Sequence, residues 1–154
     1  MKIVIGSDHR GFTAKEHIKT ILSQYGHQYI DIGTKDNNPT DYPDIAYVAA
    51  TAVSKGEADR AILICGTGIG MCIAANKVKG IRAALCHDEL TAQISRHHND
   101  SNVLCLSGDM TGEVLLRKIV EAWLTTDFHG GRHLRRINKI TAIENGKNPA
   151  EITS

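Results

Sequence analysis

The chain has 154 residues, of which 42% are hydrophobic and 23% charged, a balance typical of soluble globular proteins and not of disordered chains. Eighteen Lys and Arg residues oppose seventeen Asp and Glu residues, so the net charge of +1 gives no overall attraction to nucleic acid or to an anionic membrane. No apolar run approaches the roughly 20 residues that a membrane-spanning helix needs.

Short β-branched runs alternate with stretches of helical periodicity along the whole chain. The first half predicts a strand over 2–6, a helix between Gly11 and Gly26, a strand over 28–32, a loop over 33–41 and a helix around 45–53 that ends at Gly56. The second half predicts a strand over 61–64, a glycine-rich turn over 66–70, a helix to about 77, a strand over 81–85, a helix over 88–98, a strand over 103–106 and helices over 111–125 and 132–144.

This alternation, with short connections, predicts one α/β domain over residues 1–154. We expect a three-layer Rossmann-like fold, in which helices cover both faces of a five-stranded parallel sheet. The strand at 61–64 is apolar throughout, as strands buried on both faces are. The tail, residues 145–154, contains Gly146, Asn148 and Pro149, and we expect it to be frayed.

Polar groups follow four of the five predicted strands, and ligands of open parallel sheets bind beyond the carboxyl ends of the strands. We therefore expect the following groups to converge on one edge: Ser7-Asp8-His9-Arg10, Cys65 to Gly70, Cys86-His87-Asp88 and Ser107-Gly108-Asp109.

The run Cys65-Gly66-Thr67-Gly68-Ile69-Gly70 is the strongest chemical signal. Glycines at alternate positions allow a tight turn and a close approach of the backbone to a ligand. The free N–H groups of the turn and of the helix that follows would favour an oxyanion and the thiolate of Cys65, which could act as a base or a nucleophile. A buried structural cysteine beside a packing turn explains the spacing equally well.

A dinucleotide site fits this loop less well. The glycines do not satisfy G-x-G-x-x-G, the loop follows the third strand, and no P-loop lysine is present, although Asp88 lies about 20 residues further on, where a ribose contact would be. None of the four cysteines forms a CxxC pair, so we expect no metal site. Without an export signal at the N-terminus, free thiols in a cytoplasmic protein are the better expectation.

The last predicted helix has a basic stripe, formed by Arg132, Arg135, Arg136 and Lys139. Two arginines one turn apart can hold a phosphate with forked donors, although a solvated charged face is the common alternative. No aromatic residues interleave with the stripe, which disfavours single-stranded nucleic acid and leaves a small phosphorylated ligand as the better candidate. Asp8-His9 and His97-His98 are weak signals when taken alone, because such residues often cap helices.

Five ordered segments together resemble ribose-5-phosphate isomerases of type B, a family that also includes galactose-6-phosphate isomerase subunits. They are Gly6-Ser7-Asp8-His9-Arg10-Gly11-Phe12, Thr40-Asp41-Tyr42-Pro43-Asp44, residues 64–70 with Ala74-Ala75-Asn76-Lys77, residues 95–104, and Gly130-Gly131-Arg132-His133. The resemblance covers roughly residues 2–144. It implies a Rossmann-like sheet, no metal, no organic cofactor, and reversible conversion of ribose 5-phosphate to ribulose 5-phosphate.

The resemblance also implies roles by position. Cys65 would be the base that moves a proton between C2 and C1, while Thr67 and the N–H groups of residues 66–70 would hold the enediolate oxygens. His98 would open the sugar ring with help from Asp8. Asn99 and Tyr42 would contact hydroxyls, and His9, Arg132 and Arg136 would hold the phosphate. The site would lie between two subunits of a homodimer or a dimer of dimers, with His98 and Asn99 coming from the partner chain.

One position departs from the family pattern. Asp109 stands where the family usually has an arginine, and a carboxylate there would repel a phosphate unless Arg10 or Arg135 compensates. A hexose 6-phosphate, such as allose or galactose 6-phosphate, is therefore an alternative substrate. A non-catalytic phosphosugar or nucleotide-binding module is a further alternative, whose binding would not depend on the Cys65 thiol. Because one chain holds both the Cys65 loop and the basic helix, a self-sufficient homo-oligomer is favoured over two unlike subunits.

Overall fold

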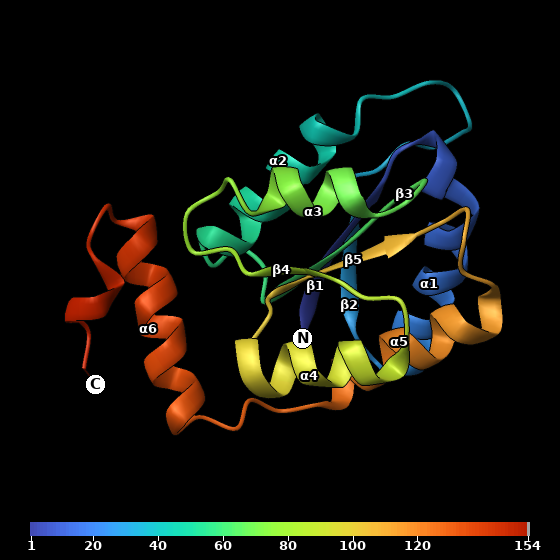
Figure 1. Cartoon of the computed structure of the whole chain (residues 1–154). Coiled ribbons are helices and arrows are strands. Elements are labelled where there is room, and N and C mark those ends of the chain that lie inside the picture. The colour runs from blue at the N-terminus through green and yellow to red at the C-terminus, as the bar shows by residue number, and fades with distance from the viewer. Residues whose placement is uncertain (154) are drawn as a thin grey trace.

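A computed structural model describes residues 1–153, which form a five-stranded parallel sheet between two layers of helices (Figure 1). The strands are β1 (Lys2–Ser7), β2 (Gln28–Asp31), β3 (Arg60–Cys65), β4 (Ala83–Leu85) and β5 (Val103–Ser107). The α-helices are α1 (Phe12–Gln24), α2 (Tyr42–Ser54), α3 (Ile69–Ala75), α4 (Glu89–Asn99), α5 (Glu113–Thr125) and α6 (Arg132–Glu144), with 3-10 helices η1 (His9–Gly11) and η2 (Pro149–Glu151). The predicted fold class is confirmed.

Two predicted segments differ from the structure. β4 has three residues instead of five, because the backbone N–H of Arg82 donates to the side-chain oxygen of Asn102 (2.8 Å) instead of to a neighbouring strand. The tail does not fray throughout: η2 forms at Pro149–Glu151, and Lys139 Nζ donates to the Pro149 carbonyl (2.8 Å). Lys139, which we expected to belong to a ligand-binding stripe, therefore holds the tail against α6 instead.

The order of the strands across the sheet is β2-β1-β3-β5-β4. From β1 the chain moves outward to β2 and then returns to place β3 on the other side of β1, so the direction of winding reverses between β1 and β3. In open α/β sheets, ligands bind in the crevice at this point of reversal. Asp8 and Cys65 stand at the carboxyl ends of the two strands that border it.

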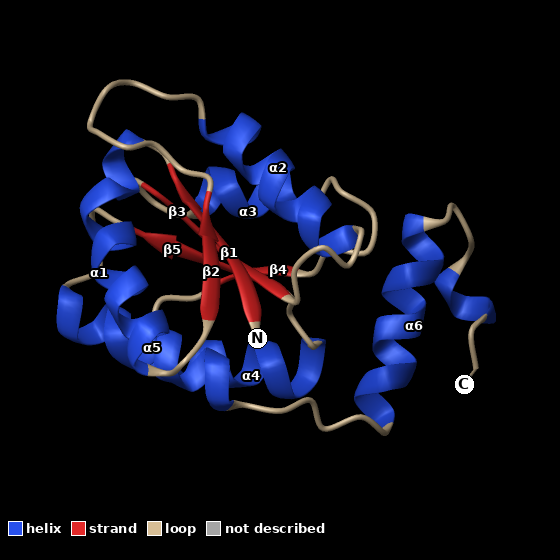
Figure 2. Ribbon diagram, turned by 180° about the vertical axis from the view of Figure 1, so that it is seen from behind, coloured by secondary structure: helices blue, strands red, loops and turns tan. Residues whose placement is uncertain are grey.

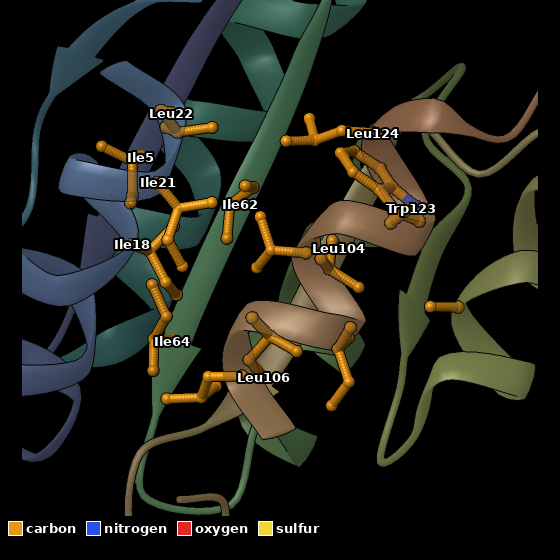
Figure 3. Close-up of a cluster of buried hydrophobic side chains, with 14 of the residues drawn as sticks. Ile5, Ile18, Ile21, Leu22, Ile62, Ile64, Leu104, Leu106, Trp123 and Leu124 are labelled. Atoms are coloured by element: carbon orange, nitrogen blue, oxygen red, sulfur yellow. The ribbon is translucent and has the colours of Figure 1, made fainter. Parts of the chain in front are cut away.

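Each face of the sheet buries its own apolar layer because strand residues alternate between the two faces. Ile62, Ile64 and Leu104 pack with α1, α4 and α5, as Figure 3 shows, together with the buried ring of Trp123. Leu63 and Cys65 point to the opposite face and pack with α2 and α3. The thiol of Cys65 therefore lies on the α2–α3 side of the sheet.

Helix α6 lies apart from both layers (Figure 2). It meets the rest of the chain at both ends: the ring of His133 stacks on His98 at the end of α4, and the Glu144 carboxylate accepts the backbone N–H of Gly80 (2.7 Å). Leu134, Ile140 and Ile143 on this helix remain 49%, 45% and 60% exposed. No helix within residues 1–153 is long and apolar enough to cross a membrane.

Candidate active site

A pocket of about 530 Å³ opens at the carboxyl edge of the sheet, where β1 and β3 border the point of reversal. Seven residues predicted from the sequence line it: Asp8, Tyr42, Cys65, Gly66, Thr67, Ile69 and Gly70. Arg10, Ile73 and Asp109 complete the lining. Ile73 was missed in the sequence analysis, although it stands four residues after Ile69 and therefore on the same face of α3.

The residues after β4 do not join this pocket, contrary to the expectation that all four polar groups converge. Cys86 is buried below the surface, where burial raises the pKa of its thiol to about 11. Asp88 caps α4 instead, because its carboxylate accepts the backbone N–H of Thr91 (2.7 Å). β4 is the edge strand, and β5 lies between it and β3, so the residues after β4 stand away from the crevice between β1 and β3.

The thiol of Cys65 faces the pocket and is held by the turn that follows it. Its Sγ accepts the backbone N–H of Gly68 (3.1 Å), which fixes the position of the sulfur at the start of the turn. Gly68 has φ +79°, and a Cβ there would lie 2.6 Å from the side chain of Leu85 and 2.9 Å from the Leu106 carbonyl. Only glycine therefore allows the turn that brings its N–H onto Sγ.

The loop after β5 fixes this turn from the side. Ser107 Oγ donates to the Gly66 carbonyl (2.6 Å), and Gly108 N–H donates to the Cys65 carbonyl (2.8 Å). Asp109 N–H also donates to the Gly66 carbonyl (3.1 Å). These bonds tie the carboxyl ends of β3 and β5 together, so the position of the thiol is set by two neighbouring strands.

Asp8 and His9 are positioned by backbone contacts. The Asp8 carboxylate is 5% exposed, and its Oδ1 accepts the N–H groups of Arg10 (3.0 Å) and Gly11 (3.1 Å), which starts η1. His9 Nδ1 accepts the N–H of Thr40 (3.2 Å), so the neutral ring carries its proton on Nε2. His9 therefore presents an N–H donor at the opposite side of the ring from Thr40.

Tyr42 begins α2 and lies against the Cys65 loop. A Cβ on Gly70 would be 2.6 Å from its ring, so the missing side chain at this position makes the space in which the ring lies on α3. The phenol lines the pocket and is 39% exposed, which leaves its hydroxyl accessible to a ligand.

Six predicted residues do not line this pocket in the same chain: His9 and Gly68, which are sequence neighbours of lining residues, and His98, Asn99, Arg132 and Arg136. Helix α4 starts beside the carboxyl end of β4 and runs back, so His98 and Asn99 lie at the amino edge of the sheet, as Figure 1 shows. There the His98 ring stacks on His133 with centroids 4.1 Å apart, and burial lowers the pKa of His133. The arginines extend from α6 into solvent.

No group of three or more His, Cys, Asp or Glu side chains with metal-binding geometry occurs within residues 1–153. The polar groups of the pocket are instead a thiol, a phenol, a hydroxyl, two carboxylates, a guanidinium and backbone N–H groups. This set suits proton transfer and the binding of a polar organic molecule.

Comparisons with known proteins agree on one family. The family described as Ribose/Galactose Isomerase matches residues 3–140. Ribose-5-phosphate isomerase B of Escherichia coli is 49% identical over 96% of this chain and 99% of its own length. The structure of ribose-5-phosphate isomerase B from Clostridium thermocellum superposes with a TM-score of 0.93 at 50% identity, over 95% of this chain and 99% of that one. The structure from Mycoplasma genitalium, with bound ribulose 5-phosphate, gives 0.90 at 45% identity, over 94% and 96%.

Proposed function

The chain belongs to the ribose/galactose isomerase family and interconverts ribose 5-phosphate and ribulose 5-phosphate, and we propose that it does so by proton transfer at Cys65. The observation that supports this mechanism is the place of the thiol, which ends β3 in the pocket and accepts the N–H of Gly68. Aldose–ketose isomerisation needs one base that moves a proton between adjacent carbons, together with donors for a developing oxyanion. The Cys65 loop supplies both.

The electron flow follows from these positions. The Cys65 thiolate takes the proton from C2 of the open-chain aldehyde, the C2–H electron pair forms the C1–C2 double bond, and the carbonyl pair moves onto the C1 oxygen. The resulting enediolate is held by Thr67 Oγ1 and the N–H groups of the loop. Cys65 then returns its proton to C1, the C2 hydroxyl becomes the ketone, and its proton passes to the C1 oxygen.

A second copy of the chain would complete the site. The cyclic sugar must open before C2 becomes acidic, and we assign this step to His98 of the partner subunit, with Asp8 at the ring oxygens. Tyr42 and Asn99 of the partner subunit would contact the hydroxyls. His9, Arg132 of the partner subunit and Arg136 of the partner subunit would hold the phosphate. Because His98 and Asn99 lie at the opposite edge of the sheet from Cys65 in one chain, the assignment requires a homodimer, alone or within a dimer of dimers.

Exposed apolar residues on the pocket rim and the charges inside the pocket support a site shared between two subunits. Ile69 and Ile73 on the pocket rim are 51% and 58% exposed, and adjacent exposed apolar residues commonly mark interfaces. The pocket of one copy presents two carboxylates, Asp8 and Asp109, against the single guanidinium of Arg10. A sugar phosphate carries about two negative charges, so one copy alone has too few cations to bind it well. The exposed arginines of α6 in a second copy would supply them.

We place the enzyme in the cytoplasm. All four cysteines are free thiols, and the mechanism depends on a reduced Cys65. Reduced cysteines are typical of the cytoplasm, where thioredoxin and glutathione keep thiols reduced.

Turnover without added metal tests the function and the choice of sugar. We expect purified protein to convert ribose 5-phosphate to ribulose 5-phosphate in buffer containing EDTA, with a higher kcat/KM than for allose 6-phosphate assayed side by side. A preference for allose 6-phosphate would assign the enzyme to hexose phosphates. Failure of well-folded protein to convert either sugar would contradict the proposed function.

A further inference from the structure

An ion pair lies on the Cys65 loop and has no role in the mechanism described above. Arg10 Nε and Nη2 both approach Asp109 Oδ2, at 2.7 Å and 2.6 Å. A Cβ on Gly66 would be 2.8 Å from that oxygen and 2.9 Å from Nε, so the pair rests directly on the residue that follows Cys65. Both side chains line the pocket.

The backbone on either side of this pair is fixed. Asp109 N–H donates to the Gly66 carbonyl (3.1 Å), and the amide of Arg10 is held by Asp8 Oδ1 (3.0 Å). A Cβ on Gly108 would be 2.7 Å from the Arg10 carbonyl, which shows how closely η1 and the loop after β5 approach each other. The Asp109 carboxylate raises the pKa of Arg10, so the guanidinium stays charged. The result is a cation at a fixed place in a pocket, although 60% of its side chain is exposed.

Arg10 keeps donors available for a ligand. A guanidinium has five N–H groups, and Asp109 takes two of them on a single oxygen. The remaining N–H groups find no further partner within residues 1–153, and Arg10 is the one cation among the residues that line the pocket. Forked N–H donors match the oxygens of a phosphate.

We propose that Arg10, held in place by Asp109, is the contact that each subunit makes to the substrate phosphate on the Cys65 side of the pocket. The proposal rests on the proposed function, because that function supplies a phosphate a few carbon atoms from the reacting end. Asp109 is a positioning residue in this account: it acts through Arg10 and its charge is neutralised there. The carboxylate that looks unfavourable in the sequence is thus part of a phosphate-binding pair.

The direction in which Asp109→Asn changes KM distinguishes a positioning role of Asp109 from a role in which it repels the phosphate. If Asp109 mainly repels the phosphate, its neutralisation lowers KM for ribose 5-phosphate. If Asp109 positions Arg10, the same change raises KM, because the freed guanidinium samples many rotamers. Asp109 and Arg10 would then also be coupled, so that the double variant Arg10→Gln/Asp109→Asn binds no worse than Arg10→Gln alone.

Steady-state kinetics on four variants test the proposal. Loss of a hydrogen bond to a charged group typically weakens binding about 10- to 100-fold, so we expect Arg10→Gln to raise KM by that factor. Its kcat should stay within about threefold of wild type, because a contact made equally in the ground and transition states affects KM alone. Asp109→Asn should raise KM by a smaller factor, and the double variant should match Arg10→Gln. The control is Arg117→Gln, which removes the same charge from a pair with Glu121 on α5 outside the pocket, and should leave KM unchanged.

Binding of inorganic phosphate provides a second measurement that needs no turnover. We expect wild-type protein to bind phosphate in an NMR titration, with chemical-shift changes at η1, and Arg10→Gln to bind it at least about tenfold more weakly. Equal phosphate affinity of wild type and Arg10→Gln, or a lowered KM in Asp109→Asn, would overturn the proposal. If the protein failed to turn over ribose 5-phosphate, the proposed function would fall, while the titration would still decide whether Arg10 binds phosphate.

Discussion

Replacing Cys65 with alanine is expected to lower kcat for ribose 5-phosphate by about 10²- to 10⁴-fold, the usual contribution of a positioned acid–base group. The side chain is small and alanine fits its space, so the fold should persist. Binding should persist as well, because Thr67, Tyr42 and the loop N–H groups remain in place. The measurements are kcat by stopped assay and the affinity for ribose 5-phosphate by calorimetry.

Cys72→Ala is the matched control for this experiment. Cys72 follows the same loop, on α3, and a hydrogen bond with Cys105 lowers its pKa to about 7. Its lowered pKa makes Cys72 the alternative candidate for a thiolate base in this region, but it does not line the pocket. We expect its removal to leave kcat within about twofold of wild type, since its partly buried side chain lies outside the pocket. If Cys65→Ala retained full turnover, another group would have to be the base.

Mixed dimers are expected to recover activity that neither parent has. Cys65→Ala and His98→Gln homodimers should each be nearly inactive with the cyclic sugar. In a heterodimer purified by two different tags, two-fold symmetry places both substitutions in one site and leaves the other site intact, so we expect about half of the wild-type kcat. The physical reason is that Cys65 and His98 stand at opposite edges of the sheet in each chain.

The heterodimer also distinguishes a shared site from a site formed within a single chain. If Cys65 and His98 of the same chain acted together, each site of the heterodimer would contain one substitution and activity would stay near the parental level. A heterodimer of wild-type chain with the double variant Cys65→Ala/His98→Gln provides the matched control. In the shared arrangement both of its sites are damaged, so it should be inactive although it carries the same substitutions.

The sequence alone predicted the order of helices and strands and the half of the site that follows β1 and β3. Periodicity placed α6 at residues 132–144, and the glycines around Cys65 located the turn, because a local pattern determines both. β4 was predicted too long because the bond from the Arg82 backbone to Asn102 joins residues 20 positions apart. Such a contact leaves no trace in local composition.

The remaining contacts of the site depend on how distant parts of the chain come together in the fold. Asp109 reads as an unfavourable carboxylate in the sequence, and its pairing with Arg10 spans 99 positions. Helix α4 connects the parallel strands β4 and β5 and therefore runs back to the amino edge, which separates His98 from Cys65 in one chain. Local motifs therefore identified the chemical groups, while the sheet determined which of them can act together in one chain.

The fate of hydrogen at C1 and C2 tests the central claim most directly. Ribose 5-phosphate would be incubated with the enzyme in D₂O, and the equilibrated sugars analysed by NMR. We predict deuterium at C2 of ribose 5-phosphate and at C1 of ribulose 5-phosphate with wild type, and no incorporation with Cys65→Ala over the same time. Incorporation by wild type requires that the proton exchanges with solvent while Cys65 holds it. Equilibration without any deuterium would contradict such an exchange, and unchanged incorporation in Cys65→Ala would show that Cys65 is not the base.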